Sequence, residues 1–261
     1  MNIVVLIKQV PEIELVKVDQ VVGEVSLPSG PGIVNPFDEY AVEEALRIKE
    51  KNGGKVTVIT VGTEKAVSAL RACLALGVDE AIMITDPLFD KSDPQAIGKI
   101  LSAGIKKIGD YHLVLAGKQA VDDDSAQVPG AVAAHLNIPQ AMFVKKIESI
   151  DDSKAVVWRT TEEGYDVVEM ALPALVSVVK EINEPRLPSL KGKMAAKKAP
   201  ITTWSAGDIG LDGAGVGPNS YTKKVKVSPP PPRQKGEFIE GETPEEIADK
   251  LYKKLKEKQV L

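Results

Sequence analysis

The stretch HLVLAGKQAVDDDSAQVPGAVAAH, residues 112–135, decides the fold of this chain. Residues 112–116 form an apolar run that predicts a buried strand, residues 117–124 predict a polar loop, and the small residues of 125–135 predict a helix. A strand followed closely by a helix is the first half of a βαβ crossover, which brings the next strand in parallel to the first. The stretch therefore predicts a parallel sheet with helices packed against it.

The same alternation extends on both sides of this stretch. Towards the N-terminus, strands are predicted at residues 2–8, 56–61 and 81–85, and helices at 35–52, 63–76 and 92–107. Towards the C-terminus, strands are predicted at 140–147, 155–159, 165–171 and 174–179, the middle two as an antiparallel hairpin. A weak hairpin signal covers residues 21–27. We predict an α/β fold with a mostly parallel, Rossmann-like open sheet and flanking helices.

The character of the sequence changes at residue 183. Residues 183–200 are rich in proline and lysine and predict an exposed arm, and residues 229–232 are four consecutive prolines. Thr243-Pro244-Glu245-Glu246 is a capping box that begins an amphipathic helix. We expect one α/β domain over residues 1–182, an exposed loop over 183–200 and an extended arm over 201–261. The final helix packs either on its own domain or on a partner subunit.

The composition argues against several classes of function. Thirty-three Lys+Arg against 37 Asp+Glu give a net charge of −4, which argues against a general nucleic-acid binder. A single cysteine excludes an intrachain disulfide, and two histidines leave no Cys/His zinc cluster. The apolar runs are too short for a membrane span, and the N-terminus has no cleavable-signal pattern. We expect a cytoplasmic protein, or one of the mitochondrial matrix if the source is eukaryotic.

Motifs of catalysis are missing from the sequence. It contains no P-loop, GxSxG, HExxH or GxGxxG pattern. His112, His135 and Cys73 lie within predicted strands or helices, where a structural role is the better interpretation. We therefore assign no catalytic residue and no metal ligand, and we expect the chain not to be an enzyme by itself.

Residues 117–128 are the best candidate for a binding segment. They follow a strand and open a helix, which is where open α/β sheets bind ligands, and free amides at the start of a helix from Ser125 would suit a phosphate. Gly117 allows close backbone approach. The three aspartates at 122–124 could cap the helix, accept ribose hydroxyls or hold a divalent metal, and the segment could also be a solvated loop. Residues 35–38 could form the opposite wall.

Several blocks of the sequence, in this order, resemble the β subunit of electron transfer flavoprotein. They are VVLIKQV, VNPFDEYAVEEALRIKE, VTVITVG, LALGVDEA, LVLAGKQAVDDDSAQVPG and LPALVSVVKEINEPRLPSL, the last followed by a lysine-rich stretch. The blocks cover about residues 1–200, and the tail is only loosely similar. The resemblance implies the adenine-nucleotide alpha-hydrolase-like form of the fold, with a nucleotide-binding domain over 1–182 and a C-terminal arm that packs on an α subunit.

The resemblance also implies a function. In that family an α subunit carries most of the FAD site, and the β subunit helps to hold this FAD and buries a structural AMP. The heterodimer takes electrons from flavin dehydrogenases, such as the acyl-CoA dehydrogenases of fatty-acid β-oxidation, and passes them to a quinone oxidoreductase. The AMP site implied by the matching motifs consists of Leu6, Asn35, Pro36, Phe37, Asp38, Val61, Gly117, Lys118, Gln119, Ala120, Val121, Asp122, Asp123, Asp124, Ser125, Ala126, Gln127 and Val128.

A partner-recognition loop is implied as well, over residues 183–200. Relatives anchor a dehydrogenase through a leucine that corresponds here to Leu190, and a single apolar anchor suits a small, short-lived interface. The nearby Lys191, Lys193, Lys197 and Lys198 could steer an acidic partner. Without the resemblance, a solvated arm would be the preferred interpretation.

Two alternatives to an AMP-binding carrier stay open. In an electron-bifurcating branch of the family, a second FAD replaces AMP, and that branch often has a glycine where this chain has Asp123. A side chain at this position would narrow the room for a flavin, so we expect AMP. The other alternative is a free-standing nucleotide-binding sensor of the same α/β architecture.

Overall fold

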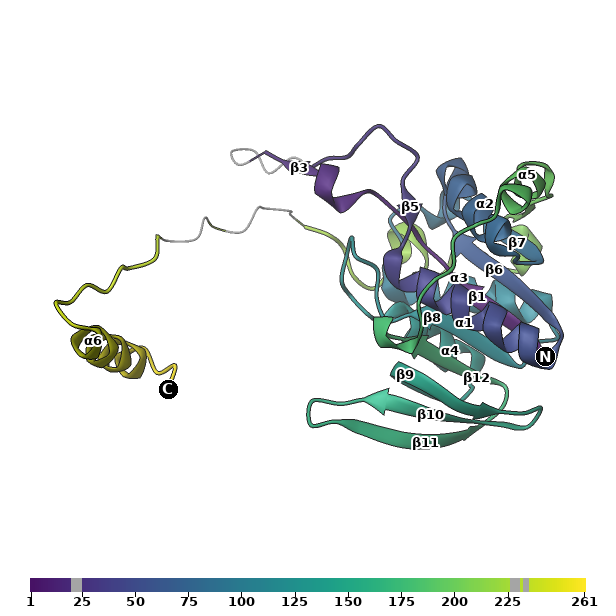
Figure 1. Ribbon diagram of the computed structural model, residues 1–261. Helices are drawn as coiled ribbons and strands as arrows, with labels where there is room; N and C mark the ends of the chain where they lie inside the picture. Colours follow the sequence, from purple (N-terminus) through teal and green to yellow (C-terminus); the bar gives the residue numbers. More distant parts are fainter. Residues whose placement is uncertain (20–24, 226–230, 232–234) are drawn as a thin grey trace.

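A nine-stranded sheet forms the centre of this computed structural model, which describes residues 1–19, 25–225, 231 and 235–261. The strand order is β11-β10-β9-β12-β8-β1-β6-β7-β13 (Figure 1). Seven strands run parallel: β1 (Asn2–Leu6), β6 (Lys55–Val61), β7 (Glu80–Ile84), β8 (Leu113–Gly117), β9 (Gln140–Ile150), β12 (Ala174–Val178) and β13 (Thr202–Trp204). The antiparallel pair β10 (Lys154–Thr160) and β11 (Tyr165–Ala171) extends the sheet beyond β9. The predicted mostly parallel α/β fold is confirmed.

Helices cover both faces of the sheet. One face packs against α1 (Pro36–Asn52), α2 (Val67–Leu76) and α5 (Leu190–Lys198), and the other against α3 (Pro94–Ile108) and α4 (Val128–Leu136). Each face has its own hydrophobic core, the first under α1, α2 and α5 and the second under α3 and α4. In β1, Ile3 and Val5 belong to the first core, whereas Val4 and Leu6 belong to the second. Because alternate residues of a strand face opposite sides, a strand with two buried faces is apolar throughout. This explains the continuous apolar run at the start of the chain.

Smaller elements lie around this framework. β2 (Gln9–Val10) pairs antiparallel with β5 (Ile33–Val34), and β3 (Lys17–Val18) pairs antiparallel with β4 (Val25–Ser26). The weak hairpin predicted at 21–27 lies partly outside the described residues. Single 3-10 turns occur at Ile13–Leu15, Glu64–Ala66, Pro87–Phe89, Lys180–Ile182, Gly207–Ile209 and Gly217–Asn219.

The ends of two helices show where local signals succeed and fail. α3 begins as predicted, because the Asp93 carboxylate accepts a hydrogen bond from the Ala96 N–H and Pro94 occupies the first turn. α4 begins at Val128 rather than at the predicted Ser125. Asp124 and Ala126 have φ angles of 54° and 53°, a left-handed conformation that cannot continue an α-helix. The first amides of this helix therefore come from residues further along the chain than predicted.

The chain beyond residue 182 contributes more to this domain than the sequence indicated. The predicted exposed arm contains α5, which begins after Ser189, whose hydroxyl accepts a hydrogen bond from the Gly192 N–H. β13 then adds a parallel edge strand to β7, and Ala206 and Val216 are buried in the second core. The domain therefore takes in residues beyond the expected boundary, because the sheet edge at β7 is completed by a later segment.

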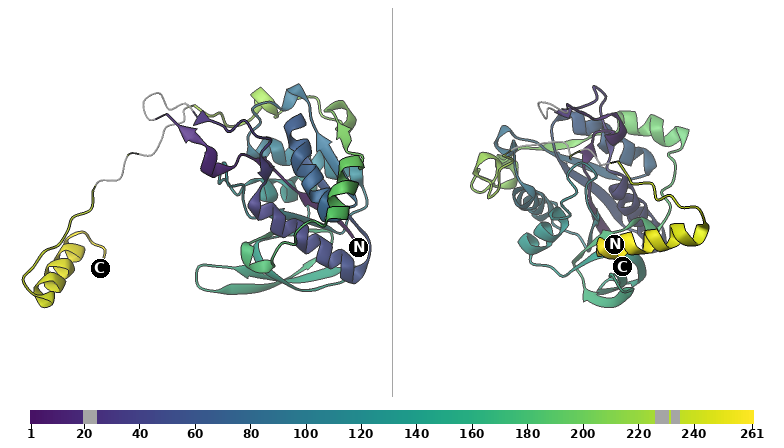
Figure 2. Two further views of the ribbon diagram at one scale, coloured as in Figure 1. Left: turned by 45° about the horizontal axis from the view of Figure 1, so that its top comes forward. Right: turned by 90° about the vertical axis from the view of Figure 1, so that its left-hand side faces the viewer.

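The final helix, α6 (Pro244–Glu257), stands away from the domain (Figures 1 and 2). It begins at the predicted capping box, where the Thr243 hydroxyl accepts a hydrogen bond from the Glu246 N–H. Its apolar side chains Ile247, Leu251 and Tyr252 are all exposed. None of the helices in the described ranges is long and apolar enough to cross a membrane.

Close packing of α3 on α4 predicts the effect of one substitution. A Cβ atom on Gly98 would lie 2.5 Å from the Cβ of Ala131, whereas a Cβ on Gly130 would meet only the Gln140 side chain, at 3.6 Å. We expect Gly98→Ala to lower the free energy of unfolding by about 1–3 kcal/mol, because the helices must separate. The matched Gly130→Ala should be neutral, or stabilising by up to about 1 kcal/mol. Urea titration measures both, and equal effects would contradict the packing argument.

Candidate nucleotide-binding site

A cavity of about 250 Å³ lies at the carboxyl-end edge of the parallel strands. Leu6, Val61 and Gly117, which end β1, β6 and β8, all line it. The full lining consists of Leu6, Ile7, Lys8, Asn35, Asp38, Val61, Ser92, Pro94, Ile97, Leu101, Ala116, Gly117, Gln119, Ala120, Asp123, Ser125, Ala126, Gln127, Val128 and Pro129. The cavity therefore lies where open α/β sheets bind their ligands.

Asn35, the residue before α1, holds the loop after β8 in place. Its side-chain Nδ2 donates a hydrogen bond to the Gln119 carbonyl at 2.8 Å, and its Oδ1 accepts one from the Val121 N–H at 3.1 Å. Its own N–H donates to the Lys8 carbonyl at 2.8 Å. Because Asn35 is buried, these bonds are shielded from water and fix the backbone of two separate loops.

Asp38, in the first turn of α1, joins the same two loops from the inside. Its Oδ2 accepts a hydrogen bond from the Lys8 N–H at 2.8 Å, and its Oδ1 accepts one from the Gly117 N–H at 3.2 Å. A Cβ on Gly117 would lie 2.5 Å from that Oδ1, so only glycine allows this approach. Burial raises the pKa of Asp38 to about 7, although these hydrogen bonds favour the charged form.

The three aspartates of the loop are engaged by neighbouring groups. Lys8 Nζ lies 2.7 Å from Asp122 and 3.0 Å from Asp123, and the pKa of Lys8 is raised because these carboxylates outweigh the effect of burial. Asp123 also accepts a hydrogen bond from the Ser125 N–H at 3.1 Å, and Asp124 accepts one from the Gln119 side chain. Lys8 thus offsets the negative charge that would otherwise repel a phosphate.

A metal at these aspartates gains no support from the structure. Among the residues that it describes, His, Cys, Asp and Glu side chains nowhere gather in a group of three or more that could hold a metal ion. The pairing of Asp122 and Asp123 with Lys8, which the structure displays, was not among the interpretations that the sequence left open for this loop.

The opposite side of the cavity combines a polar and an apolar wall. α4 begins at Val128 without a side-chain cap, and the N–H groups of a first helical turn have no acceptor within the helix. These amides are suited to an anion such as a phosphate, and Pro129 removes only one of them. Ile97 and Leu101 of α3 supply apolar surface. A small ligand with one anionic group and one flat apolar ring fits this arrangement.

The structure brings most, but not all, of the expected site residues to the cavity. Those that line it are Leu6, Asn35, Asp38, Val61, Gly117, Gln119, Ala120, Asp123, Ser125, Ala126, Gln127 and Val128. Those outside the lining are Pro36, Phe37, Lys118, Val121, Asp122 and Asp124. Phe37 instead lies beneath Lys118, whose Nζ is 4.7 Å from the ring centre.

Sequence reasoning missed two polar residues, Lys8 and Ser92, and one wall of this cavity. Lys8 follows β1, and its position at a strand end could have signalled its place in the cavity. Pro94 and Ile97 belong to the start of α3, and Ser92 lies just before it; this segment was predicted as a helix but not as a wall. α3 and α4 cover the same face of the sheet, and both begin near its carboxyl-end edge. The sequence does not tell how close the start of α3 comes to the cavity there.

The expected docking residues gather on one exposed helix. Leu190 begins α5 with 78% of its surface exposed, and Lys191, Lys193, Lys197 and Lys198 are exposed on the same helix. Two further apolar side chains lie nearby and were missed, Leu187 at 91% and Met194 at 64% exposed. Met194 follows Leu190 at the spacing of one helical turn, which was a signal that could have found it, whereas Leu187 lies before the helix begins.

This fold and this cavity define an α/β protein with a candidate ligand site at the carboxyl-end edge of its sheet, and comparison with known proteins gives its family. Residues 25–209 match the sequence model of the electron transfer flavoprotein domain. The chain is 44% identical to the caffeyl-CoA reductase–Etf complex subunit CarD of Acetobacterium woodii, over the full length of both. It is 42% identical to the electron transfer flavoprotein subunit beta of Thermoanaerobacterium thermosaccharolyticum, also over both full lengths, and 41% identical to that of Clostridium acetobutylicum, over 98% of each. The chain belongs to the electron transfer flavoprotein β-subunit family.

Family membership carries several coarse conclusions. Members are electron carriers, they bind flavin or nucleotide, and they pair with an α subunit. The resemblance drawn from the sequence blocks is thereby confirmed.

Asp38 predicts a pH dependence of stability. Burial raises its pKa from 3.8 to about 7, so its contribution to stability is full below pH 3.8, declines as the pH rises, and is lost once the pH passes about 7. We expect the unfolding free energy of the wild type, relative to Asp38→Asn, to be level below about pH 4, to fall by up to about 1.4 kcal/mol per pH unit between about pH 4 and pH 7, and then to level off again. Urea titration at several pH values measures this difference. A difference that is independent of pH would contradict the prediction.

Proposed function

We propose that this chain is the β subunit of a heterodimeric electron transfer flavoprotein, with a structural AMP in the cavity. The observation that carries the proposal is the cavity of about 250 Å³ at the carboxyl-end edge, bounded by the uncapped start of α4 and by apolar side chains of α3. The amides of Gln127 and Val128 would face the phosphate, and the Ile97 side of the cavity would receive the adenine.

The size of the cavity favours AMP over a second FAD. Ligand sites usually measure about 300–1,000 Å³, and this cavity of about 250 Å³ lies just below that range, which suits a mononucleotide better than a dinucleotide. Asp123 lines the cavity and is held there by Lys8. Its side chain occupies space that the glycine of the bifurcating branch would leave open. Both observations support AMP.

In the heterodimer, the FAD that is shared with the α subunit would supply the redox chemistry. Leu190 would dock an acyl-CoA dehydrogenase or another flavin dehydrogenase, and the reduced carrier would then pass its electrons on towards a quinone oxidoreductase. The exposed apolar side chains of α6 support packing of the C-terminal arm, residues 201–261, on the α subunit. Lysines around Leu190 would steer an acidic partner.

The relative CarD favours a second candidate function. Its printed name makes it a subunit of a caffeyl-CoA reductase–Etf complex, and the 44% identity extends over both full lengths. By this analogy the partner of our chain would be a reductase of CoA thioesters, and a second FAD in the AMP position would make the carrier a bifurcating one. The free-standing sensor is the third candidate, and the exposed α6 argues against it.

Nucleotide content tests these candidates directly. The chain is co-expressed with an α partner, the purified complex is denatured, and the released AMP and FAD are quantified. One FAD and one AMP per heterodimer support the proposal, whereas two FAD and no AMP establish the bifurcating candidate. A complex without flavin would contradict both, and a stable monomer with no affinity for an α subunit would favour the sensor.

Gly117→Ala should empty the nucleotide cavity. Its Cβ would lie 2.5 Å from Asp38 Oδ1 and 2.6 Å from the Phe37 backbone carbon, so the loop must move away from α1. We expect the AMP content of the purified heterodimer to fall at least about tenfold, with FAD retained on the α subunit. Gly207→Ala is the matched control, because its Cβ meets only the Ser205 hydroxyl, at 3.9 Å. Full AMP occupancy in Gly117→Ala would refute this view of the loop.

Leu190→Ala should weaken docking of the dehydrogenase. Truncation of an apolar anchor at the centre of an interface costs about 2 kcal/mol, so we expect the KM of the carrier for an acyl-CoA dehydrogenase to rise at least about tenfold. Val167→Ala on β11, at the far edge of the sheet, removes a comparably exposed side chain and serves as the control. Equal KM values for the two variants would remove Leu190 from the docking surface.

A further inference from the structure

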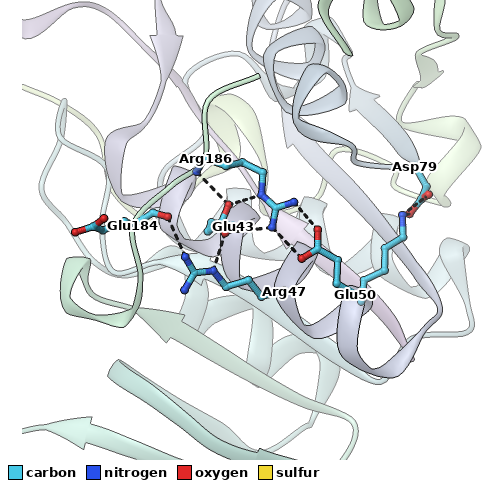
Figure 3. A network of polar contacts seen from close by, with 7 residues as sticks. Glu43, Arg47, Glu50, Asp79, Glu184 and Arg186 are labelled. Carbon is cyan, nitrogen blue, oxygen red and sulfur yellow. Dashed lines mark hydrogen bonds and ion pairs between the residues drawn. The ribbon is translucent and has the colours of Figure 1, made fainter. Parts of the chain in front are cut away.

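A network of charged side chains surrounds Glu43 in the middle of α1 (Figure 3). The Glu43 side chain is only 4% exposed, yet it lies between two arginines. Arg186 Nε donates to Glu43 Oε2 at 2.8 Å, and Arg47 Nε donates to Glu43 Oε1 at 2.6 Å. The terminal nitrogens of Arg186 also bind both oxygens of Glu50. The Arg186 guanidinium thus binds the carboxylates of Glu43 and Glu50, which are two helical turns apart on α1.

The same network fixes the backbone of residues 183–186. The Arg186 N–H donates to Glu43 Oε2 at 3.1 Å, and Arg47 donates to the Glu184 carbonyl at 3.1 Å. Asn183 Nδ2 donates to the Tyr40 carbonyl at 3.1 Å. These bonds tie both the backbone and the side chains of this short segment to α1.

The other end of the docking segment is fixed to α2. A Cβ on Gly192 would overlap the Ala75 carbonyl oxygen, so α5 lies against α2 at this point. Arg71 of α2 donates hydrogen bonds to the carbonyls of Ala196 and Ala199 at the end of α5. Residues 187–194, here called the docking segment, carry the three exposed apolar side chains and include Gly192, one of the attachments to α2.

We propose that Arg186 is a positioning residue for partner docking, which it serves by fixing residues 187–194 to α1 through Glu43 and Glu50. This inference rests on the proposed docking function of Leu190. A side chain that is 78% exposed makes few contacts with its own domain, so its position depends on the backbone that carries it. A fixed backbone reduces the entropy that is lost when the apolar side chains enter a partner.

The geometry separates positioning from simple charge steering. Arg186 lies against two carboxylates, so its charge is largely compensated, whereas Lys191 is exposed on the docking helix. Hydrogen bonds from Arg186 lower the pKa of Glu50, and at Glu43 the hydrogen bonds from Arg186 and Arg47 outweigh the opposing effect of burial. Both carboxylates therefore stay ionised near neutral pH and keep hold of Arg186.

The test compares Arg186→Gln with Lys191→Gln in the complete heterodimer. Each variant removes one positive charge, but only the first breaks the attachment to α1. The assay follows reduction of the carrier flavin by an acyl-CoA dehydrogenase with its acyl-CoA substrate, at low salt and at about 1 M salt, where the Debye length is about 3 Å. Glu50→Gln weakens the contact of Arg186 with Glu50 and leaves its contact with Glu43 intact. Because Glu50 is exposed, this variant tests the attachment even if Arg186→Gln fails to fold. Thermal unfolding and AMP content report on that fold.

We expect Arg186→Gln to raise the KM for the dehydrogenase about tenfold at both salt concentrations, with kcat within about twofold of the wild type. Glu50→Gln should raise the KM less, and Lys191→Gln should change it only at low salt. In the double variant with Leu190→Ala, the rise in KM should be smaller than the product of the two single rises. The reason is that Leu190, once displaced by Arg186→Gln, contributes less to docking, so its removal costs less.

Three results would overturn the inference. The first is an unchanged KM in Arg186→Gln. The second is a rise in KM in Arg186→Gln that equals the rise in Lys191→Gln and disappears at high salt. The third is a KM rise in the double variant equal to the product of the rises in Arg186→Gln and Leu190→Ala. If Leu190→Ala itself leaves the KM unchanged, the docking proposal fails and the inference falls with it. A raised KM for Leu190→Ala beside an unchanged KM for Arg186→Gln overturns the inference alone.

Discussion

The hydrogen bonds from the backbone of Lys8 and Gly117 to the buried carboxylate of Asp38 are the constraint on which the site depends. They draw the ends of β1 and β8 against the first turn of α1, and Asn35 fixes the following loop in the same way. A carboxylate in this position is costly to bury, as its raised pKa shows, and the two N–H donors offset part of that cost. These bonds hold the loop after β8 in the conformation that leaves the cavity open.

α1 is the element that the proposed nucleotide cavity and the proposed docking segment share. Its first turn holds the loops of the cavity, and its middle holds the docking segment through Glu43. A helix is a stiff rod, so both surfaces are fixed to one rigid frame. The nucleotide would then be structural, in the sense that it fills the cavity at one end of this frame, while the partner would bind near the other.

The sequence predicted the elements whose signals are local. The apolar run of β1, the capping of α3 by Asp93 and the capping box of α6 each depend on residues within one or two turns, and all three are present. The start of α4 was misplaced, because left-handed backbone at Asp124 and Ala126 leaves no clear mark in the residue types. The helix within residues 183–200 was missed although Leu, Lys, Met and Ala, which favour helix, make up all of it except Gly192. Prolines on either side of it and its exposed lysines indicated an arm, and its packing against α2 is a tertiary contact that no local signal reports.

By itself, the sequence determined the α/β class, the family and the segments that carry the cavity, because these follow from the order of apolar runs and from contiguous motifs. Tertiary structure alone decided which side chains meet. Lys8 is more than a hundred residues from the aspartates it pairs with, and Arg186 is equally remote from Glu43. Such pairs are set by how strands and helices pack in space, and periodicity along a chain reports only which face a residue occupies, never what lies opposite it.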